Sequence, residues 1–249
     1  MSDLKGKRIL VTGAAGGLGC ALVTTLLAAG AEVCGLVRDE TDAAMLRDLH
    51  PVDAALHAIV ADLSQPDDAR TAVTAEIAAR GPIYGLVNNA AIYPKAEAAD
   101  LDSAEITAVL GVNAVAAAAM VRACAAGMKT LGEGRIINIA SNTFDTGMTE
   151  LSAYVASKGA LIGLARVWAR ELGQHGITAN AVSPGAFCTD AEKIHADQEA
   201  YSASVIALQA IKRRGYPSEF ADLVAFLLSG KAGFITGQTI RIDGGVVTQ

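Results

Sequence analysis

The chain has 249 residues, of which 52% are hydrophobic and 18% charged, and its formal net charge is −6. This composition excludes a disordered protein and leaves ample material for the core of one large α/β domain. Basic residues are not clustered, so we expect no nucleic-acid partner. The four cysteines and four histidines form neither a CxxC pair nor a metal-ligand spacing, which predicts reduced thiols, a cytoplasmic protein and no bound metal.

Two uncharged stretches, Ile9–Ala31 and Ile106–Val121, raise the question of a membrane-spanning helix. The first contains four glycines in its first half, and the second is rich in alanine and carries Asn113. No apolar segment follows the basic residues near the N-terminus, so no signal peptide is expected. We therefore expect no association with a membrane.

The first quarter of the chain alternates apolar runs with a helical pattern. Arg8–Thr12 predicts a buried strand, and apolar residues from Leu18 to Ala29 recur at helical spacing until Gly30 ends the helix. Two more short apolar runs, Glu32–Val37 and Leu56–Ala61, predict the second and third strands.

The starts of two helices are marked by their polar residues. Ser64, Pro66 and Asp67 resemble a cap, a first-turn proline and an acidic first turn. Asp102, with Glu105 three residues later, predicts the start of a long alanine-rich helix.

The rest of the chain repeats the alternation. Helices are predicted from about 152 to 172, stopped by Gly173, and from 217 to 228; strands are predicted at Ile83–Val87, Arg135–Ala140, Ile177–Val182 and Thr239–Ile242. Strictly alternating strands and helices predict an α/β fold, a doubly wound parallel sheet of about seven strands with helices on both faces. We expect one domain over residues 1–249, in which the irregular segment 186–216 forms a substrate lid.

A glycine-rich turn follows the first strand. The stretch TGAAGGLG, from Thr12 to Gly19, separates that strand from the amphipathic helix. Glycines there allow a tight turn and let a pyrophosphate approach the backbone, while the helix N-terminus offers free N–H groups to the anion. The pattern predicts a dinucleotide-binding site.

The spacing of these glycines, TGxxxGxG, resembles the short-chain dehydrogenase/reductase family of NAD(P)-dependent oxidoreductases with a Rossmann-type fold, and the resemblance covers nearly the whole chain. Asn88-Asn89-Ala90 is similar to the family's NNAG element, with Ala91 in place of the usual glycine. Asp62 matches an adenine-contacting aspartate, and Pro184-Gly185 with Thr189 resembles the PG…T element beside the nicotinamide. The resemblance implies cofactor contacts from Gly13, Gly16, Gly17, Leu18, Gly19, Arg38, Asp62, Leu63, Asn89, Ala90, Tyr154, Lys158, Pro184, Gly185 and Thr189.

Tyr154 and Lys158 stand four residues apart and share one face of the predicted helix. A tyrosine hydroxyl ordinarily has a pKa near 10, and a nearby ammonium would lower it, so Tyr154 could act as a general acid or base. A surface tyrosine–lysine pair is the alternative. Ser141 and Asn113 have the spacing of the family's Asn–Ser–Tyr–Lys tetrad. The resemblance implies that Ser141 bonds the substrate oxygen, that Asn113 holds a water connected to Lys158, and that Lys158 also binds the nicotinamide ribose.

The end of the second strand bears on cofactor selectivity. An acidic residue there accepts from the ribose hydroxyls of NAD, but this chain has Val37 followed by Arg38, whose guanidinium suits the 2′-phosphate of NADP. Asp39 and the absence of a basic residue at Gly16 oppose that reading. The sequence therefore favours NADP(H) and leaves NAD(H) possible.

The substrate is expected to contact residues 91–95, 142–148 and the lid, with Phe144, Met148 and Phe187 as candidates for an apolar wall or for core packing. We expect a small secondary alcohol or ketone. A 3-oxoacyl thioester, a catalytically inactive dinucleotide sensor and a structural subunit remain alternatives. The resemblance also implies a homotetramer.

Overall fold

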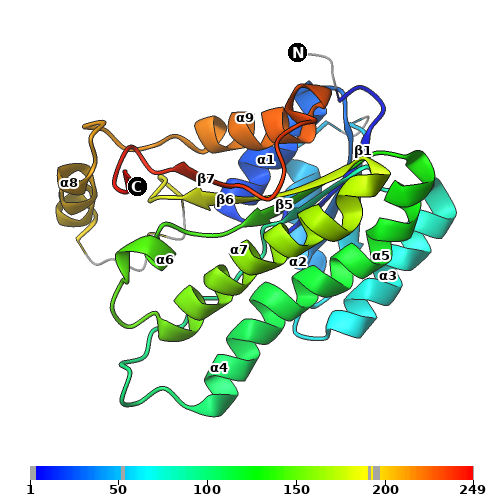
Figure 1. Ribbon diagram of the computed structural model, residues 1–249. Coiled ribbons are helices and arrows are strands. Elements are labelled where there is room, and N and C mark those ends of the chain that lie inside the picture. Colours follow the sequence, from blue (N-terminus) through cyan, green and yellow to red (C-terminus); the bar gives the residue numbers. More distant parts are fainter. Residues whose placement is uncertain (1–3, 52–53, 190–191, 193–196, 249) are drawn as a thin grey trace.

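A seven-stranded parallel sheet forms the centre of the computed structural model, which describes residues 4–51, 54–189, 192 and 197–248 (Figure 1). In chain order the elements are β1 (Arg8–Thr12), α1 (Gly17–Ala28), β2 (Glu32–Val37), α2 (Glu40–Asp48), β3 (Leu56–Val60), α3 (Pro66–Arg80), β4 (Gly85–Asn88), α4 (Ser103–Leu110), η1 (Gly111–Val115), α5 (Ala116–Leu131), β5 (Gly134–Ile139), α6 (Thr143–Thr146), α7 (Ser152–Leu172), η2 (Gly173–His175), β6 (Ile177–Pro184), α8 (Gln198–Leu208), α9 (Pro217–Leu228), η4 (Gly230–Ala232) and β7 (Thr239–Ile242).

The strand order is β3-β2-β1-β4-β5-β6-β7, and every neighbouring pair is parallel. Successive strands are added outward from β1 on one side and from β4 on the other. The chain thus reverses its direction of winding between β1 and β4, and in open sheets of this kind ligands bind at the carboxyl ends of the strands beside that reversal. The predicted doubly wound α/β fold is confirmed.

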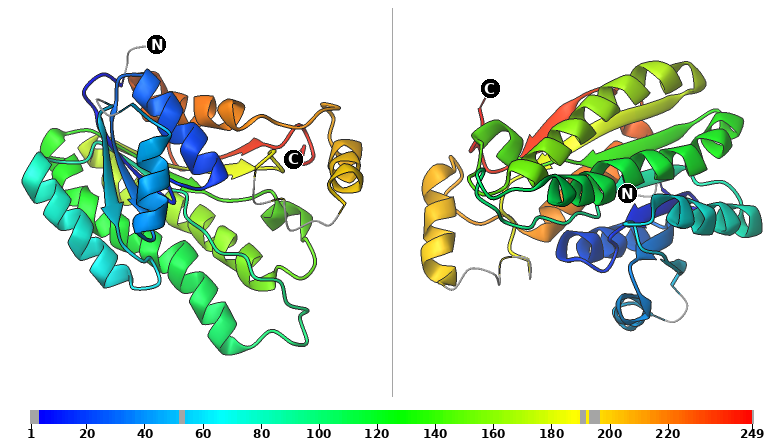
Figure 2. Two further views of the ribbon diagram at one scale, coloured as in Figure 1. Left: turned by 180° about the vertical axis from the view of Figure 1, so that it is seen from behind. Right: turned by 90° about the horizontal axis from the view of Figure 1, so that it is seen from below.

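Helices cover both faces of the sheet (Figure 2). On one face α1, α2 and α9 pack around a core that includes Leu22, Leu26 and Phe220. On the other face α3, α5 and α7 enclose a second core that contains Met120 and Trp168. The strands are buried on both sides, which explains why their sequences are continuous apolar runs rather than alternating ones.

The sequence located most element boundaries to within two residues, and the deviations have local causes. The cap of α3 is Gln65 rather than Ser64, whose N–H is instead bound by the Asp62 carboxylate at 2.8 Å. The helix that begins after Asp102 contains one π-helical turn, η1, at Asn113. Three α-helices were not predicted: α2, which Asp39 caps, the short α6 after β5, and α8, which lies within the expected lid.

The continuous helix Ser103–Leu131 spans 29 residues and contains an 18-residue stretch with a mean hydropathy of 1.8, so it is long and apolar enough to cross a membrane. Length and composition are the only grounds for that possibility. Core helices of soluble proteins pass the same test, and here Met120, Cys124 and Met128 are buried against the sheet.

The interface between α1 and α9 gives a test of the core. Phe220 is fully buried there and makes an edge-to-face contact with Phe187, at 6.1 Å between ring centroids. We predict that Phe220→Ala lowers the free energy of unfolding by about 3–5 kcal/mol, because the cavity it leaves cannot collapse completely. Phe226→Ala, on the same helix but 43% exposed, is the matched control and should cost about 1 kcal/mol or less. Denaturant unfolding measures both, and equal losses would contradict this account of the core.

Candidate functional site

A cleft of about 710 Å³ lies at the carboxyl ends of the central strands. The residues that the sequence assigned to cofactor contacts, from Gly13 to Thr189, all line this cleft. Three of the four proposed catalytic residues, Ser141, Tyr154 and Lys158, line it as well, whereas Asn113 lies behind its wall.

Three glycines of the turn between β1 and α1, namely Gly13, Gly17 and Gly19, have no room for a side chain. Gly13 has φ +63°, and a Cβ on it would lie 2.9 Å from the Cα of Ala90. A Cβ on Gly19 would lie 2.2 Å from the carbonyl oxygen of Gly13, and one on Gly17 would lie 2.6 Å from Cβ of Thr189. The first N–H groups of α1 have no acceptor within the helix. A backbone cradle that any side chain would fill, beside free N–H groups, fits a pyrophosphate.

Asn89 and Thr12 hold the glycine turn against the end of β4. The Asn89 side-chain amide donates to the carbonyl oxygens of Thr12 and Gly13, at 3.0 and 3.1 Å. In return, Thr12 Oγ1 accepts from the N–H groups of Asn89 and Ala90, at 2.9 and 3.1 Å. These four bonds explain why polar residues follow β4 directly, since they set the floor of the cleft.

The far end of the cleft is formed by the end of β2. Val37 is buried, and the side chain of Arg38 is 72% exposed. Its Nε lies 3.1 Å from the Asp39 carboxylate, and Asp42 and Asp62 line the same end of the cleft. One exposed cation therefore stands among three carboxylates.

Ser141, Tyr154 and Lys158 meet where β5 ends against α7. Ser141 follows β5 and is 6% exposed, while Lys158 on α7 is 2% exposed and donates from Nζ to the carbonyl oxygen of Ile139 at 2.7 Å. Lys158 Nζ lies 5.2 Å from the centroid of the Tyr154 ring. That ring also makes an edge-to-face contact with the Tyr93 ring, at 6.0 Å between centroids.

Burial dominates the proton affinities of this group. It lowers the pKa of Lys158 to about 7 and raises the pKa of Tyr154 above its ordinary value. A hydrogen bond with Ser141 opposes the rise for Tyr154. The expectation that Lys158 lowers the pKa of Tyr154 is therefore wrong for the protein without its cofactor, because the buried lysine binds its own proton weakly and Ser141 is the group that favours the phenolate.

Asn113 is fully engaged with protein groups. Its carbonyl oxygen accepts from Ile92 N–H at 2.8 Å, and its amide donates to the Ile92 carbonyl and to Ser157 Oγ, both at 2.9 Å. It sits in the π-helical turn η1, a departure from α-helical geometry that often accompanies a functional site. Asn113 thus connects the loop after β4 to Ser157 on α7, one residue before Lys158. That Asn113 holds a water molecule connected to Lys158 remains a prediction.

A second cavity, of about 500 Å³, adjoins the cleft and shares Leu18, Tyr93, Ser141, Tyr154 and Thr189 with it, among others. Side chains from the loops after β4 and β5, from α8 and from the C-terminal segment line it, including Met148, Leu151, Phe187, Tyr201, Val205, Leu208 and Val246.

The lining of the second cavity can be compared with the three side chains proposed for an apolar wall. Met148 and Phe187 line it. Phe144 does not, because its ring covers Gly159 on α7. Tyr201, Val205 and Leu208 of α8 fall within the lid that was expected to contact the substrate, but the sequence analysis did not single them out, although their spacing of four and three residues is helical.

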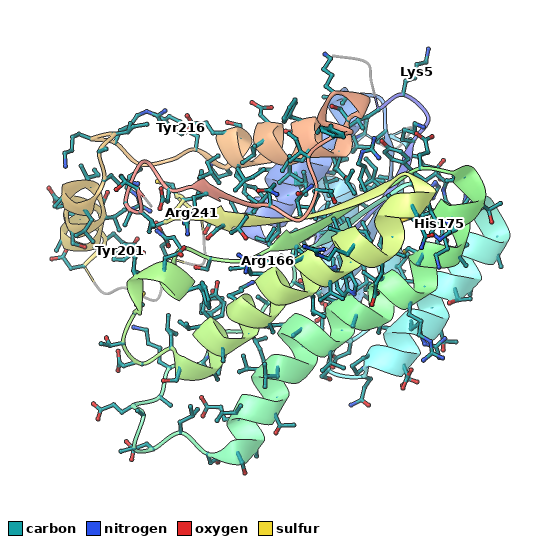
Figure 3. All side chains as sticks on the ribbon, in the orientation of Figure 1. Lys5, Arg166, His175, Tyr201, Tyr216 and Arg241 are labelled. Atoms are coloured by element: carbon teal, nitrogen blue, oxygen red, sulfur yellow. The ribbon has the colours of Figure 1, made fainter. Side chains whose placement is uncertain are left out.

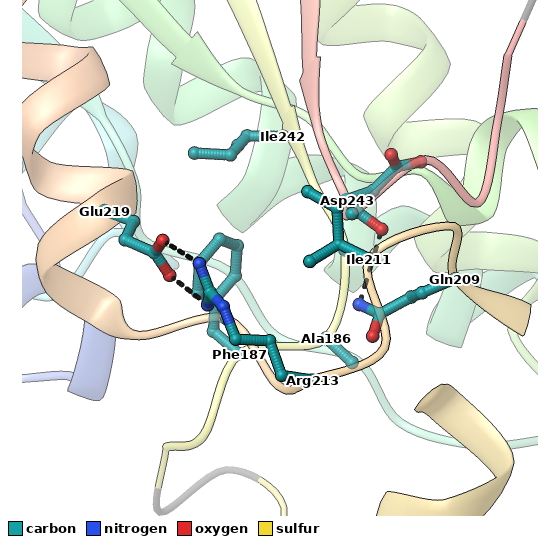
Figure 4. Close-up of a pocket in the computed structure, with 11 residues that line it drawn as sticks. Ala186, Phe187, Gln209, Ile211, Arg213, Glu219, Ile242 and Asp243 are labelled. Atoms are coloured by element: carbon teal, nitrogen blue, oxygen red, sulfur yellow. Dashed lines mark hydrogen bonds and ion pairs between the residues drawn. The ribbon is translucent and has the colours of Figure 1, made fainter. Parts of the chain in front are cut away.

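A third cavity, of about 100 Å³, lies where the segment after α8 meets β7 (Figure 4). There Arg213 binds both carboxylate oxygens of Glu219, at 2.5 and 2.9 Å, and lowers the pKa of Glu219 to about 2. Gln209 donates to the Asp243 carbonyl at 3.4 Å. These contacts anchor the far end of the expected lid, and residues 190, 191 and 193–196 of that lid lie outside the described residues.

No group of three or more metal-ligating side chains occurs in the part of the chain that the structure describes.

Comparison with known proteins gives matches over almost the whole chain. Residues 13–247 match the family model described as enoyl-(acyl carrier protein) reductase. The chain is 32% identical over 251 residues to 2-(S)-hydroxypropyl-CoM dehydrogenase 3 of Xanthobacter autotrophicus, covering 98% of this chain and 97% of that protein. It is 32% identical over 244 residues to the 3-oxoacyl-[acyl-carrier-protein] reductase of Escherichia coli, covering 98% of each.

Solved structures agree with these matches. A gluconate 5-dehydrogenase from Burkholderia cenocepacia, in complex with NADP and tartrate, superposes with a TM-score of 0.91 at 32% identity, covering 98% of this chain and 96% of that one. A short-chain dehydrogenase/reductase mutant from Serratia marcescens gives a TM-score of 0.90 at 31% identity, covering 99% and 100%.

The bonds of Asn113 predict a structural effect that a purely catalytic role would not. Asn113→Ala leaves the backbone of Ile92 and the Ser157 hydroxyl without their partner, and a buried polar group without its bond costs about 1–3 kcal/mol. We predict a loss of about 2–3 kcal/mol in the free energy of unfolding, measured by denaturant titration without cofactor. A variant as stable as the parent would show that these bonds contribute nothing.

Proposed function

Because the chain belongs to the short-chain dehydrogenase/reductase family of oxidoreductases, we propose that it transfers a hydride between a bound nicotinamide and a small secondary alcohol or ketone, with Tyr154 as the general acid or base. The observation that carries this proposal is the shared wall of two cavities. Ser141 and Tyr154 line both the cleft with the glycine cradle and the second, largely apolar cavity. A substrate in the second cavity would meet both hydroxyls next to the cofactor cleft.

Tyr154 and Ser141 act on the substrate oxygen. In reduction of a ketone, Tyr154 gives its proton to the oxygen on which negative charge develops, and Ser141 donates a hydrogen bond to the same oxygen. In oxidation Tyr154 takes the hydroxyl proton of the alcohol. The nicotinamide, when bound, supplies or accepts the hydride.

Lys158 contributes from beneath the tyrosine. Its Nζ donates to the Ile139 carbonyl and lies over the Tyr154 ring. The remaining protons of the amine can reach the ribose hydroxyls of a cofactor in the cleft. Since Lys158 has a pKa of about 7, it can hold or release a proton near neutral pH.

NADP(H) is the proposed cofactor, with NAD(H) possible. Arg38 supports NADP(H) because a guanidinium at the end of β2 can pair with a 2′-phosphate, and the Burkholderia dehydrogenase was crystallised with NADP. The nearby carboxylates of Asp39, Asp42 and Asp62 weaken that attraction. They leave NAD(H) as a competing ligand.

A 3-oxoacyl thioester is the second candidate substrate, supported by 32% identity to the E. coli 3-oxoacyl reductase. The apolar walls from Met148, Leu151 and Val205 accommodate a short alkyl chain on either substrate. An assay of small ketones and acyl thioesters, in which the absorbance of the reduced cofactor reports turnover, distinguishes the two candidate substrate classes. Turnover of the thioesters alone would overturn the proposal of a small alcohol or ketone.

We also propose a cytoplasmic homotetramer. The four cysteines are free thiols, as a reducing compartment requires. Val115 and Val167, on the helices that cover one face of the sheet, are 55% and 49% exposed and would be buried between subunits. Sedimentation of the purified protein tests the assembly.

The role of Tyr154 can be tested with the smallest change. We predict that Tyr154→Phe lowers turnover by about 10²–10⁴-fold, because the hydroxyl that exchanges the proton is lost while the ring is kept. Cofactor affinity should change little, and thermal stabilisation by NADPH should persist, since the ring still fills its place. Normal turnover by this variant would exclude Tyr154 as the acid or base.

Cofactor choice can be tested at Arg38. We predict that Arg38→Ala weakens NADPH binding about tenfold and NADH binding by less than about threefold, because the hydrogen bonds lost are those to a charged phosphate. Arg47→Ala, an exposed arginine on α2 outside the cleft, is the matched control. Equal losses for the two cofactors would contradict recognition of the 2′-phosphate by Arg38.

A further inference from the structure

Thr143, at the start of α6, bonds the oxygen of Ser141 twice. Its hydroxyl lies 2.9 Å from Ser141 Oγ, and its backbone N–H donates to the same oxygen over 3.2 Å. Ser141 is 6% exposed, and both residues line the second cavity.

A serine hydroxyl has one proton to donate and two lone pairs that accept. The backbone N–H of Thr143 can only donate, so it occupies one lone pair. If the Thr143 hydroxyl occupies the other, Ser141 can offer the cavity only its proton. A hydroxyl that is locked as a donor suits an oxygen on which negative charge develops.

The position of Thr143 is itself fixed from both sides of α6. The Phe144 ring covers Gly159 so closely that a Cβ there would lie 2.6 Å from it. Asp145 accepts two hydrogen bonds from Arg241 on β7, at 2.6 and 2.9 Å, and Arg241 is labelled above α6 in Figure 3. These contacts hold the backbone of the turn, and so keep Thr143 within hydrogen-bond reach of Ser141.

We propose that Thr143 is a positioning residue for the reaction: it saturates the oxygen of Ser141 and so directs the single Ser141 proton toward Tyr154 and the substrate oxygen. This inference rests on the proposed function, in which Ser141 and Tyr154 act on the substrate. It assigns a task to a residue beyond the tetrad.

The consequence is a shift in pH dependence. The groups that face Tyr154 are Ser141, the Lys158 amine and the Tyr93 ring. Burial raises the pKa of Tyr154, and the Ser141 hydrogen bond lowers it. When Ser141 is no longer held as a donor, the pKa of Tyr154 rises further, and alcohol oxidation, which needs the phenolate, requires a higher pH.

The test compares Thr143→Val, which keeps the branched shape but removes the hydroxyl, with Thr143→Ser, which restores it. We expect Thr143→Val to lower kcat for oxidation about tenfold at neutral pH and to move its alkaline rise upward by as much as about one pH unit. KM for the cofactor should not change, and Thr143→Ser should recover most of the rate. Thr130→Val removes a hydroxyl from the exposed face of α5, where it bonds the Ala126 carbonyl at 3.1 Å, and should change none of these.

A second readout needs neither cofactor nor turnover. The ultraviolet absorbance of the phenolate, measured as the difference from Tyr154→Phe, reports the titration of Tyr154 among the five tyrosines. It should move to higher pH in Thr143→Val. An unchanged titration would overturn the inference, and a move to lower pH would show that Ser141 had been donating to Thr143 instead.

The two proposals fail in different ways. Normal turnover by both Tyr154→Phe and Ser141→Ala would overturn the proposed function, while the Tyr154 titration would still decide the direction of the Thr143 bond. If those two variants are inactive and Thr143→Val keeps its rate and its alkaline rise, the role of Thr143 alone is wrong.

Discussion

The packing of α7 across the ends of β5 and β6 is the constraint on which the candidate site depends. It places Lys158 beneath Tyr154 with 2% of its surface exposed and a single bond to the Ile139 carbonyl. A lysine amine buried in this way loses more hydration than one hydrogen bond returns, so its pKa falls to about 7. The fold thus stabilises an arrangement that is unfavourable for the lysine itself, and such arrangements concentrate at functional sites.

That burial makes stability depend on pH. Between about 7 and the ordinary value of 10.5, the folded state holds fewer protons on Lys158 than the unfolded chain does. The contribution of Lys158 to the free energy of unfolding therefore rises with pH across this window and is lowest below about 7. An anionic cofactor in the adjoining cleft would favour the protonated amine and so offset part of this cost.

Sequence alone located the sheet, the glycine turn and the residues that line the cleft, because each is imposed by backbone geometry. Gly19 must be glycine where a Cβ would meet the Gly13 carbonyl, and this requirement is local to the chain. The π-helical turn at Asn113 and the bond from Thr143 to Ser141 were not foreseen. Both depend on how separate elements pack against one another, and residue spacing along the sequence does not reveal that packing. The expected effect of Lys158 on Tyr154 failed for the same reason, since spacing along a helix does not reveal burial.

The two halves of the site are held by different forces, and this bears on substrate choice. The cofactor half rests on buried backbone contacts around the glycine turn. The second cavity is bordered by α6 and α8, and the Arg213–Glu219 ion pair that follows α8 is exposed, with 48% and 39% of the two side chains accessible. Exposed ion pairs contribute little individually and can be exchanged at small cost to the fold. Proteins about 32% identical to this chain are named for hydroxypropyl-CoM and 3-oxoacyl substrates. A tightly packed backbone cradle beside a wall of side chains that can be exchanged fits that range.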